Sequence, residues 1–355
     1  MLNTRLKKAI LTGITLLLTF NANRANAAGY YSDRYSPCAP CQQLICPIPC
    51  NSNFYLGAEA LIWKACNKDQ SFGAVTTIDS DSLTTITLQS ADHDWSLGFR
   101  LLGGYHVVSC CDWELSLAYT NFSSNSAGSF FSVLEIDAVE QDANLRFSNR
   151  LNYQTFDALL KKELIMSECG SIRPFFGFRG LWLGQNPTMT IDFTDAEQIF
   201  VTSQQTSSVK GFGLHAGSEY HWAVCNGFGI YGTIGASALH GSMNNVHHQI
   251  VLEELTVGVL EVVEEVSIID KQCAPIFGYQ LGTGMRYEMN FCGCGLDMLV
   301  RFDLGYEFNH WICTPQALGG GLLDEPFEID VLGTLRNNNG SLLLQGVRIG
   351  LGVYF

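Results

Sequence analysis

The chain has 355 residues, of which 47% are hydrophobic and 15% charged, and its acidic residues exceed its basic ones by 14. This acidic balance argues against nucleic acid as a partner, because phosphate backbones are bound by surplus Lys and Arg. The length would allow two soluble domains, but one strand pattern continues without a linker, so one domain is expected.

Residues 1–27 have the pattern of a secretory signal peptide. Basic residues precede an apolar run at 9–20, and Ala25-Asn26-Ala27 follows as a small-residue cleavage pattern. The run has 12 residues, and a membrane-spanning helix needs about 20. We expect a mature chain from Ala28 with a net charge near −18 (16 basic minus 34 acidic residues, since the signal removes four basic residues).

The segments after residue 53 alternate apolar and polar residues. At the end of the chain, Val347, Ile349 and Leu351 are apolar, and Arg348 and Gly350 lie between them. Alternate side chains of a strand point to opposite faces, and segments of about ten such residues are typical of transmembrane barrels. An exported β-sandwich would also alternate, but its strands are usually about five or six residues long. Ten strands are predicted at 53–64, 93–107, 112–122, 150–164, 172–184, 208–222, 227–240, 275–289, 295–310 and 342–355.

The predicted fold class is all-β, a transmembrane antiparallel β-barrel with short periplasmic turns and long extracellular loops. Residues 28–52 would form a Cys/Pro-rich periplasmic segment, and 53–355 the barrel. The strand at 150–164 has the weakest pattern, because Thr155 and Asp157 interrupt its apolar face. Strand-like pieces within the long loops either extend the strands above the membrane or raise the strand number to 12–16. Ten strands leave a narrow lumen, which inward glycines would widen.

Thirteen cysteines in an exported protein indicate disulfide chemistry. Most fall in the N-terminal segment or the short turns, so they would face the periplasm and cross-link the protein to itself or to other envelope proteins. Cys273 and Cys313 flank neighbouring strands and are candidates for pairing. A metal knuckle in the N-terminal segment is the alternative, but its spacers are Pro-rich and lack His. The other candidates are Cys38, Cys41, Cys46, Cys50, Cys110, Cys111, Cys169, Cys225, Cys292 and Cys294.

Two segments and the C-terminus resemble a known family. They are Phe54-Tyr55-Leu56-Gly57-Ala58-Glu59-Ala60-Leu61-Ile62-Trp63-Lys64, the stretch Arg173-Pro174-Phe175-Phe176-Gly177-Phe178-Arg179-Gly180, and Phe355, which resembles the terminal aromatic that signals barrel assembly. With the Cys-bearing turns, they are similar to the cysteine-rich major-outer-membrane-protein-like (MOMP-like) porins of chlamydia-related bacteria and Legionella. The resemblance implies an outer-membrane porin that also has structural and adhesive roles.

The alternation assigns charged residues to the lumen. Facing rows of Arg and carboxylate would shape a pore constriction, and ion pairs that fill a small barrel are the alternative. The pore-lining candidates are Arg100, Arg179, Arg286, Arg301, Arg348, Glu59, Glu114, Glu219, Glu288, Asp297, Asp303 and Glu307. These candidates comprise seven carboxylates and five Arg residues, so if the lumen conducts, we expect a slight preference for cations.

The sequence predicts no enzyme, cofactor or metal site. His247-His248 lies in an outer loop without a placed carboxylate partner, and Glu253–Glu265 is either a solvated hairpin or an adhesive, cation-binding surface. We expect passive diffusion of small solutes and ions, with disulfide support of the envelope. The alternative is a structural or adhesive barrel with little conductance. The partners would be outer-membrane lipid and small solutes, and the sequence leaves a homo-oligomer open.

Overall fold

The computed structural model describes residues 54–66, 71–78, 84–90, 93–107, 113–136, 139–167, 169–193, 199–225, 227–256, 259–293, 296–315 and 339–355. The predicted signal peptide and the segment 28–52 lie outside these residues. No helix in the described part of the chain is long and apolar enough to cross a membrane.

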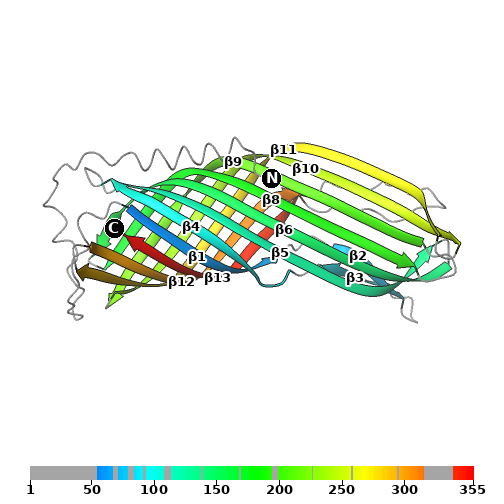
Figure 1. Cartoon of the computed structure of the whole chain (residues 1–355), viewed down its shortest axis with the longest axis horizontal. Helices are drawn as coiled ribbons and strands as arrows, with labels where there is room; N and C mark the ends of the chain where they lie inside the picture. The colour runs from blue at the N-terminus through cyan, green and yellow to red at the C-terminus, as the bar shows by residue number, and fades with distance from the viewer. Residues whose placement is uncertain are drawn as a thin grey trace. The chain divides into compact units, whose positions relative to one another are not determined.

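Ten long antiparallel strands close into one barrel, as predicted (Figure 1). Their order is β6-β5-β4-β1-β13-β12-β11-β10-β9-β8, and pairing of β6 with β8 closes the ring. The four-residue β7 (Leu164–Ser167) continues the line of β6 beside β8. The bounds are β1 Phe54–Cys66, β4 Ser96–Val107, β5 Trp113–Ile136, β6 Val139–Lys162, β8 Gly170–Phe193, β9 Ile199–Cys225, β10 Phe228–Thr256, β11 Val259–Gly293, β12 Leu296–Pro315 and β13 Asn339–Tyr354.

The strand pairing fixes the tilt and width of the barrel. A path from Phe54 across each neighbouring strand in turn returns to β1 at Cys66, a stagger of 66 − 54 = 12 residues. Ten strands with this stagger incline by about 40° and enclose a backbone cylinder of about 10 Å radius. Inward Arg or Trp side chains from opposite walls therefore meet near the axis.

The strand-like pieces of the predicted outer loops add no spanning strands. Residues 188–193 and 199–203 continue β8 and β9, and residues 249–256 and 259–269 continue β10 and β11, which reach 29 and 35 residues. In Figure 1, β10 and β11 extend as a long hairpin. The pieces at 71–90 form a separate sheet of β2 (Ser71–Ile78) and β3 (Thr84–Ser90). Nearly every strand is longer than predicted, because the ladder continues past the last lipid-facing residue.

The outer face of the barrel carries an apolar belt. In β9, Phe212, Leu214, Tyr220 and Trp222 point outward and are exposed. The 10 steps along the strand from Trp222 to Phe212 span about 25 Å at this tilt, the height of the apolar band of such barrels. This belt is the lipid-facing surface.

Asp157 does not interrupt the apolar face of its strand, contrary to the sequence prediction. It faces the lumen with Thr155, and both are buried, whereas Phe156 is exposed on the outer face. The outward face of this strand is therefore that of Phe156, opposite to the face predicted from the sequence. The mutual pairing of Phe54 and Phe355, with N···O distances of 3.0 and 3.1 Å, joins the ends of the first and last strands.

Inward glycines do not widen the lumen, because neighbouring side chains occupy the space they leave. A Cβ at Gly278 would lie 2.7 Å from the Trp311 ring, and one at Gly284 would lie 2.5 Å from the Tyr231 hydroxyl. Such ring-over-glycine packing is a known device for stabilising glycine in sheets. In the turn between β9 and β10, Gly227 has a φ of 77°, which favours glycine.

Candidate functional site

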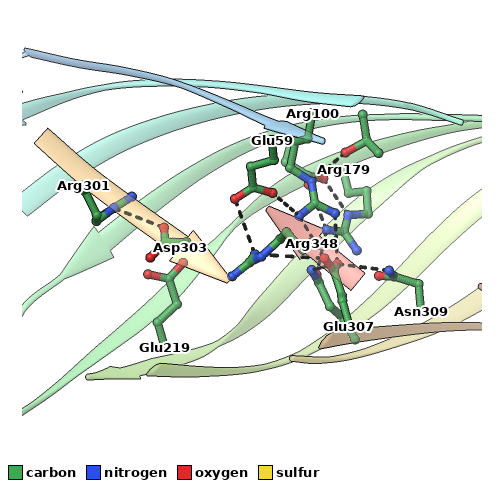
Figure 2. A network of polar contacts seen from close by, with 12 residues as sticks. Glu59, Arg100, Arg179, Glu219, Arg301, Asp303, Glu307, Asn309 and Arg348 are labelled. Atoms are coloured by element: carbon green, nitrogen blue, oxygen red, sulfur yellow. Dashed lines mark hydrogen bonds and ion pairs between the residues drawn. The ribbon is translucent and has the colours of Figure 1, made fainter. Parts of the chain in front are cut away.

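A cluster of ion pairs crosses the lumen halfway up the barrel. The Arg100 guanidinium on β4 donates to Glu59 at 2.9 Å and to both carboxylate oxygens of Glu307 at 2.9 and 3.0 Å. Arg348 lies 3.6 Å from Glu59 and 4.0 Å from Glu307 (Figure 2). These residues come from the four neighbouring strands β4, β1, β13 and β12, so the cluster holds together the part of the wall where the first and last strands pair.

A second pair completes this middle charged layer. Arg179 on β8 contacts both carboxylate oxygens of Asp157 on β6, with a distance of 2.8 Å for one of them, and donates to Gln280 at 3.1 Å. His215 lies beside it, 2.9 Å from the Ser237 hydroxyl, which Arg179 also contacts. We define the middle charged layer as Glu59, Arg100, Asp157, Arg179, Glu307 and Arg348.

A further charged layer lies toward the end with short turns. Lys161 donates to Glu219 at 2.7 Å, and Asp303 accepts from Arg286 at 2.8 Å. Arg301 is 3.2 Å from Asp303. Arg173 reaches Glu114 at 3.7 Å. We call Glu114, Lys161, Arg173, Glu219, Arg286, Arg301 and Asp303 the short-turn charged layer.

The predicted lumen residues are brought together with few exceptions. All five predicted Arg residues and five of the seven predicted carboxylates belong to the two layers. Glu288 lies in register with Arg301 on the same face, and the Asp297 side chain lies outside the described residues.

The sequence prediction missed Asp157, Lys161 and Arg173. Assigning the inward face of β6 from the exposed Phe156 would have found the first two, and the parity that found Arg179 would have found Arg173. With them, seven basic and five acidic residues line the cavity described below. The acidic excess that suggested a cation preference is therefore absent from this lining.

An apolar layer fills the lumen above the middle charged layer. Trp63 and Leu61 on β1 are fully buried, and the Trp63 ring packs at 5.5 Å from Phe122 and 6.3 Å from Tyr153. Tyr153 in turn lies 6.3 Å from Trp311 on the far wall. The layer takes residues from nine of the ten strands: Leu61, Trp63, Ala65, Phe122, Leu151, Tyr153, Leu181, Leu183, Val209, Leu239, Met243, Ile276, Trp311, Leu342 and Leu344.

Two arginines of the middle charged layer cover the underside of the apolar layer. The Arg100 guanidinium lies 5.8 Å from the centre of the Trp63 ring, and Arg179 lies 6.0 Å from that of Trp311. Such contacts between a cation and an aromatic face stabilise desolvated guanidinium groups. The charged and apolar layers are therefore packed as one unit.

The cavity within the two charged layers is small. Its volume is about 110 Å³, and Tyr231 projects into it with its ring between Arg286 and Arg348, at 5.1 and 4.9 Å. Such a volume holds a few water molecules. Above the apolar layer, buried polar side chains such as His93 and Ser124, 3.2 Å apart, fill the lumen again.

The outer hairpin of β10 and β11 corrects one sequence expectation. His248, expected to lack a carboxylate partner, lies 2.9 Å from Glu265. The hairpin also pairs Glu253 with Glu261 across its strands. Among the described residues, no group of His, Cys, Asp and Glu has the arrangement of a metal site.

Three cysteines can be placed. Cys273 is exposed and carries a free thiol, so its predicted pairing with Cys313 is wrong: Cys273 points to the outer face, and the ladder places Ile312 opposite Phe277, four residues away. Cys66 is also free, and Gln345 donates to its sulfur at 3.6 Å. Cys169, in the turn before β8, is disulfide-bonded. The side chains of the other candidates lie outside the described residues.

A closed barrel with an apolar belt outside and paired charges inside is the architecture of a bacterial outer-membrane protein. The chain belongs to the family described as Legionella pneumophila major outer membrane protein precursor, whose model matches residues 47–355. It is accordingly a protein of the bacterial outer membrane, and the family expected from the sequence is confirmed.

Solved structures show more distant similarity. The outer membrane protease OmpT from Escherichia coli matches with 8% identity and a TM-score of 0.30, over 85% of this chain and 96% of that chain. The TodX deltaS2S3 mutant monoaromatic hydrocarbon channel matches with 9% identity and a TM-score of 0.18, over 85% and 89%. No curated protein sequence matches the chain.

Proposed function

We propose that this protein is a structural barrel of the outer membrane whose lumen is closed to dissolved solutes. The observation that carries the proposal is the apolar layer, in which Leu61, Trp63 and Leu344 are fully buried. An ion crossing it would lose its hydration at a cost of several kcal/mol or more, and an apolar constriction is a known way to stop conduction. This was the alternative interpretation of the sequence.

The disulfide-bonded Cys169 supports a structural role, because its bond lies within this chain and stiffens the barrel. It lies at the short-turn end of the barrel, which in outer-membrane barrels faces the periplasm. The four N-terminal cysteines and those of the other short turns would share this side. Covalent links there would stiffen the envelope without affecting the lipid-facing wall.

Passive diffusion of small solutes and ions is the second candidate function. The facing rows of Arg and carboxylate below the apolar layer, such as Arg348 and Glu59, favour it. Diffusion would require the apolar layer to open, because its buried side chains are packed across the lumen.

Liposome swelling separates the two candidates. Vesicles containing the purified protein are diluted into sugars of increasing size, with an open general porin as positive control and empty vesicles as negative control. A closed barrel gives the swelling rate of the empty vesicles for every sugar. Size-dependent swelling would show a diffusion channel instead.

A further inference from the structure

The outer wall carries basic residues just beyond the apolar belt. Arg146 and Arg150 on β6, Lys210 on β9 and Lys271 on β11 point outward and are exposed, and we call these four the basic rim. None of them makes an ion pair with a described residue. They are therefore available to an external anion.

The basic rim has only one carboxylate among the outward positions around it. The outward positions at this height are the even positions of 144–150, 184–192, 202–210 and 240–248 and the odd positions of 267–275. Among these positions Asp192, in register with Asn144, is the one carboxylate, and it makes no ion pair with the basic rim. The chain as a whole has 34 acidic and 20 basic residues. Positive charge is thus concentrated on one band of an otherwise acidic protein.

The depth of this band identifies what it meets. Lys210 lies two residues beyond Phe212 and in register with Trp182, both exposed aromatic residues of the belt. Aromatic girdles of this kind mark the level of lipid headgroups. Lys271 lies six residues beyond the exposed Phe277 on the same strand. Because the strand is tilted, this is about 15 Å further along the barrel axis, a level that the headgroups of large glycolipids reach.

The strand register brings two of these cations to one polar strip. Lys210 is in register with Ser242, and Lys271 is in register with Asn244, both outward on β10. The lysines lie two strands and two residues apart, about 12 Å, with the two polar side chains between them. Their flexible side chains can therefore converge on one multivalent anion.

We propose that the basic rim binds the phosphate groups of the glycolipid that forms the outer leaflet, the lipid A class. Acyl chains would lie on the apolar belt below, and phosphates would meet the cations between the end of the belt, at Lys210, and the level of Lys271. Each Lys or Arg near an anionic lipid surface contributes about 1 kcal/mol. The acidic hairpin of β10 and β11 would project past the phosphates, because like charges repel.

The test uses the full-length protein folded in neutral detergent micelles and titrated with diphosphoryl lipid A. The variant Arg146→Gln, Arg150→Gln, Lys210→Gln, Lys271→Gln removes the rim. Lys162→Gln is the matched control, because Lys162 lies near the opposite end of the barrel, 5.5 Å from the Trp113 ring. Binding is measured by native mass spectrometry and by the rise in unfolding temperature, and circular dichroism verifies the β-sheet fold.

We expect the fourfold variant to bind diphosphoryl lipid A at least about tenfold more weakly, and the control to bind like the wild type. Dephosphorylated lipid A should bind the wild type as weakly as the variant binds the phosphorylated form. Equal binding by wild type and variant, or equal binding of both lipids by the wild type, would overturn the proposal. If the fourfold variant does not fold, Lys210→Gln with Lys271→Gln serves instead, with an expected loss of at least about fivefold.

Discussion

Arg100 on β4 and Glu307 on β12 form a bidentate pair across the inside of the barrel, although β1 and β13 lie between their strands. The two residues are 207 positions apart in the sequence. A contact of this kind forms only after the ring has closed, so it stabilises the closed barrel rather than any single hairpin. Both residues are buried, and the lumen is therefore held by charge pairs that have no access to bulk water.

Neutralising Glu307 should destabilise the barrel. Its carboxylate accepts from Arg100, Gln280 and Asn309. Glu307→Gln would leave Arg100 and Arg348 with too little negative charge, and breaking a buried ion pair costs about 3–5 kcal/mol. Urea unfolding in detergent measures the change in the free energy of unfolding. The exposed Glu265 provides the matched control, and Glu265→Gln should change stability by less than about 1 kcal/mol. Equal effects of the two substitutions would contradict the role of the charged layer.

A side chain at Gly278 should disturb the apolar layer. Its Cβ would lie 2.7 Å from the Trp311 ring, whereas a Cβ at Gly184 would meet nothing within 4 Å. Gly278→Val should therefore lower the free energy of unfolding by about 1–3 kcal/mol, the usual cost of overpacking, while Gly184→Val changes it little. Indistinguishable unfolding curves for the two variants would show that ring-over-glycine packing is unimportant.

The cysteines should differ in reactivity without unfolding. Cys273 is exposed and free, so a thiol-alkylating reagent should label it in intact cells or native micelles. Cys169 is disulfide-bonded and should be labelled only after reduction. Peptide mass spectrometry gives the modified positions. Labelling of Cys169 without reductant would refute its disulfide, and protection of Cys273 would place it in a bond or interface.

Acid should loosen the outer hairpin through His247, which lies on β10 beyond the apolar belt. Burial lowers the pKa of His247, and the neighbouring charge of His248 lowers it further. Because the folded pKa lies below the unfolded value of about 6.5, the hairpin keeps its full stability above that value and loses it as the pH falls below. Hydrogen exchange of residues 244–250 should accelerate between pH 7.5 and pH 5. His247→Gln should remove this acceleration, while His248→Gln retains it; the same acceleration in His247→Gln would assign the effect to another group.

The sequence was sufficient for the strands and for most of the lumen residues, because period-two alternation directly reports which face is apolar. It failed on β6, where Phe156, Ala158 and Leu160 form a weaker outer face than the neighbouring strands have. It also failed on the glycines and on the width of the lumen. Whether Gly278 leaves a space depends on Trp311, which lies on another strand at a register set by the barrel stagger. Local patterns contain no information on such contacts.

The central claim is that the apolar layer closes the lumen, and single-channel conductance in planar bilayers tests it most directly. The wild type should show no steady current, and the double variant Trp63→Ala, Trp311→Ala should open a measurable conductance, because it removes two large rings from the layer. Phe178→Ala, on the exposed outer face, is the control and should remain closed. Steady conductance by the wild type, unchanged in the double variant, would contradict the account.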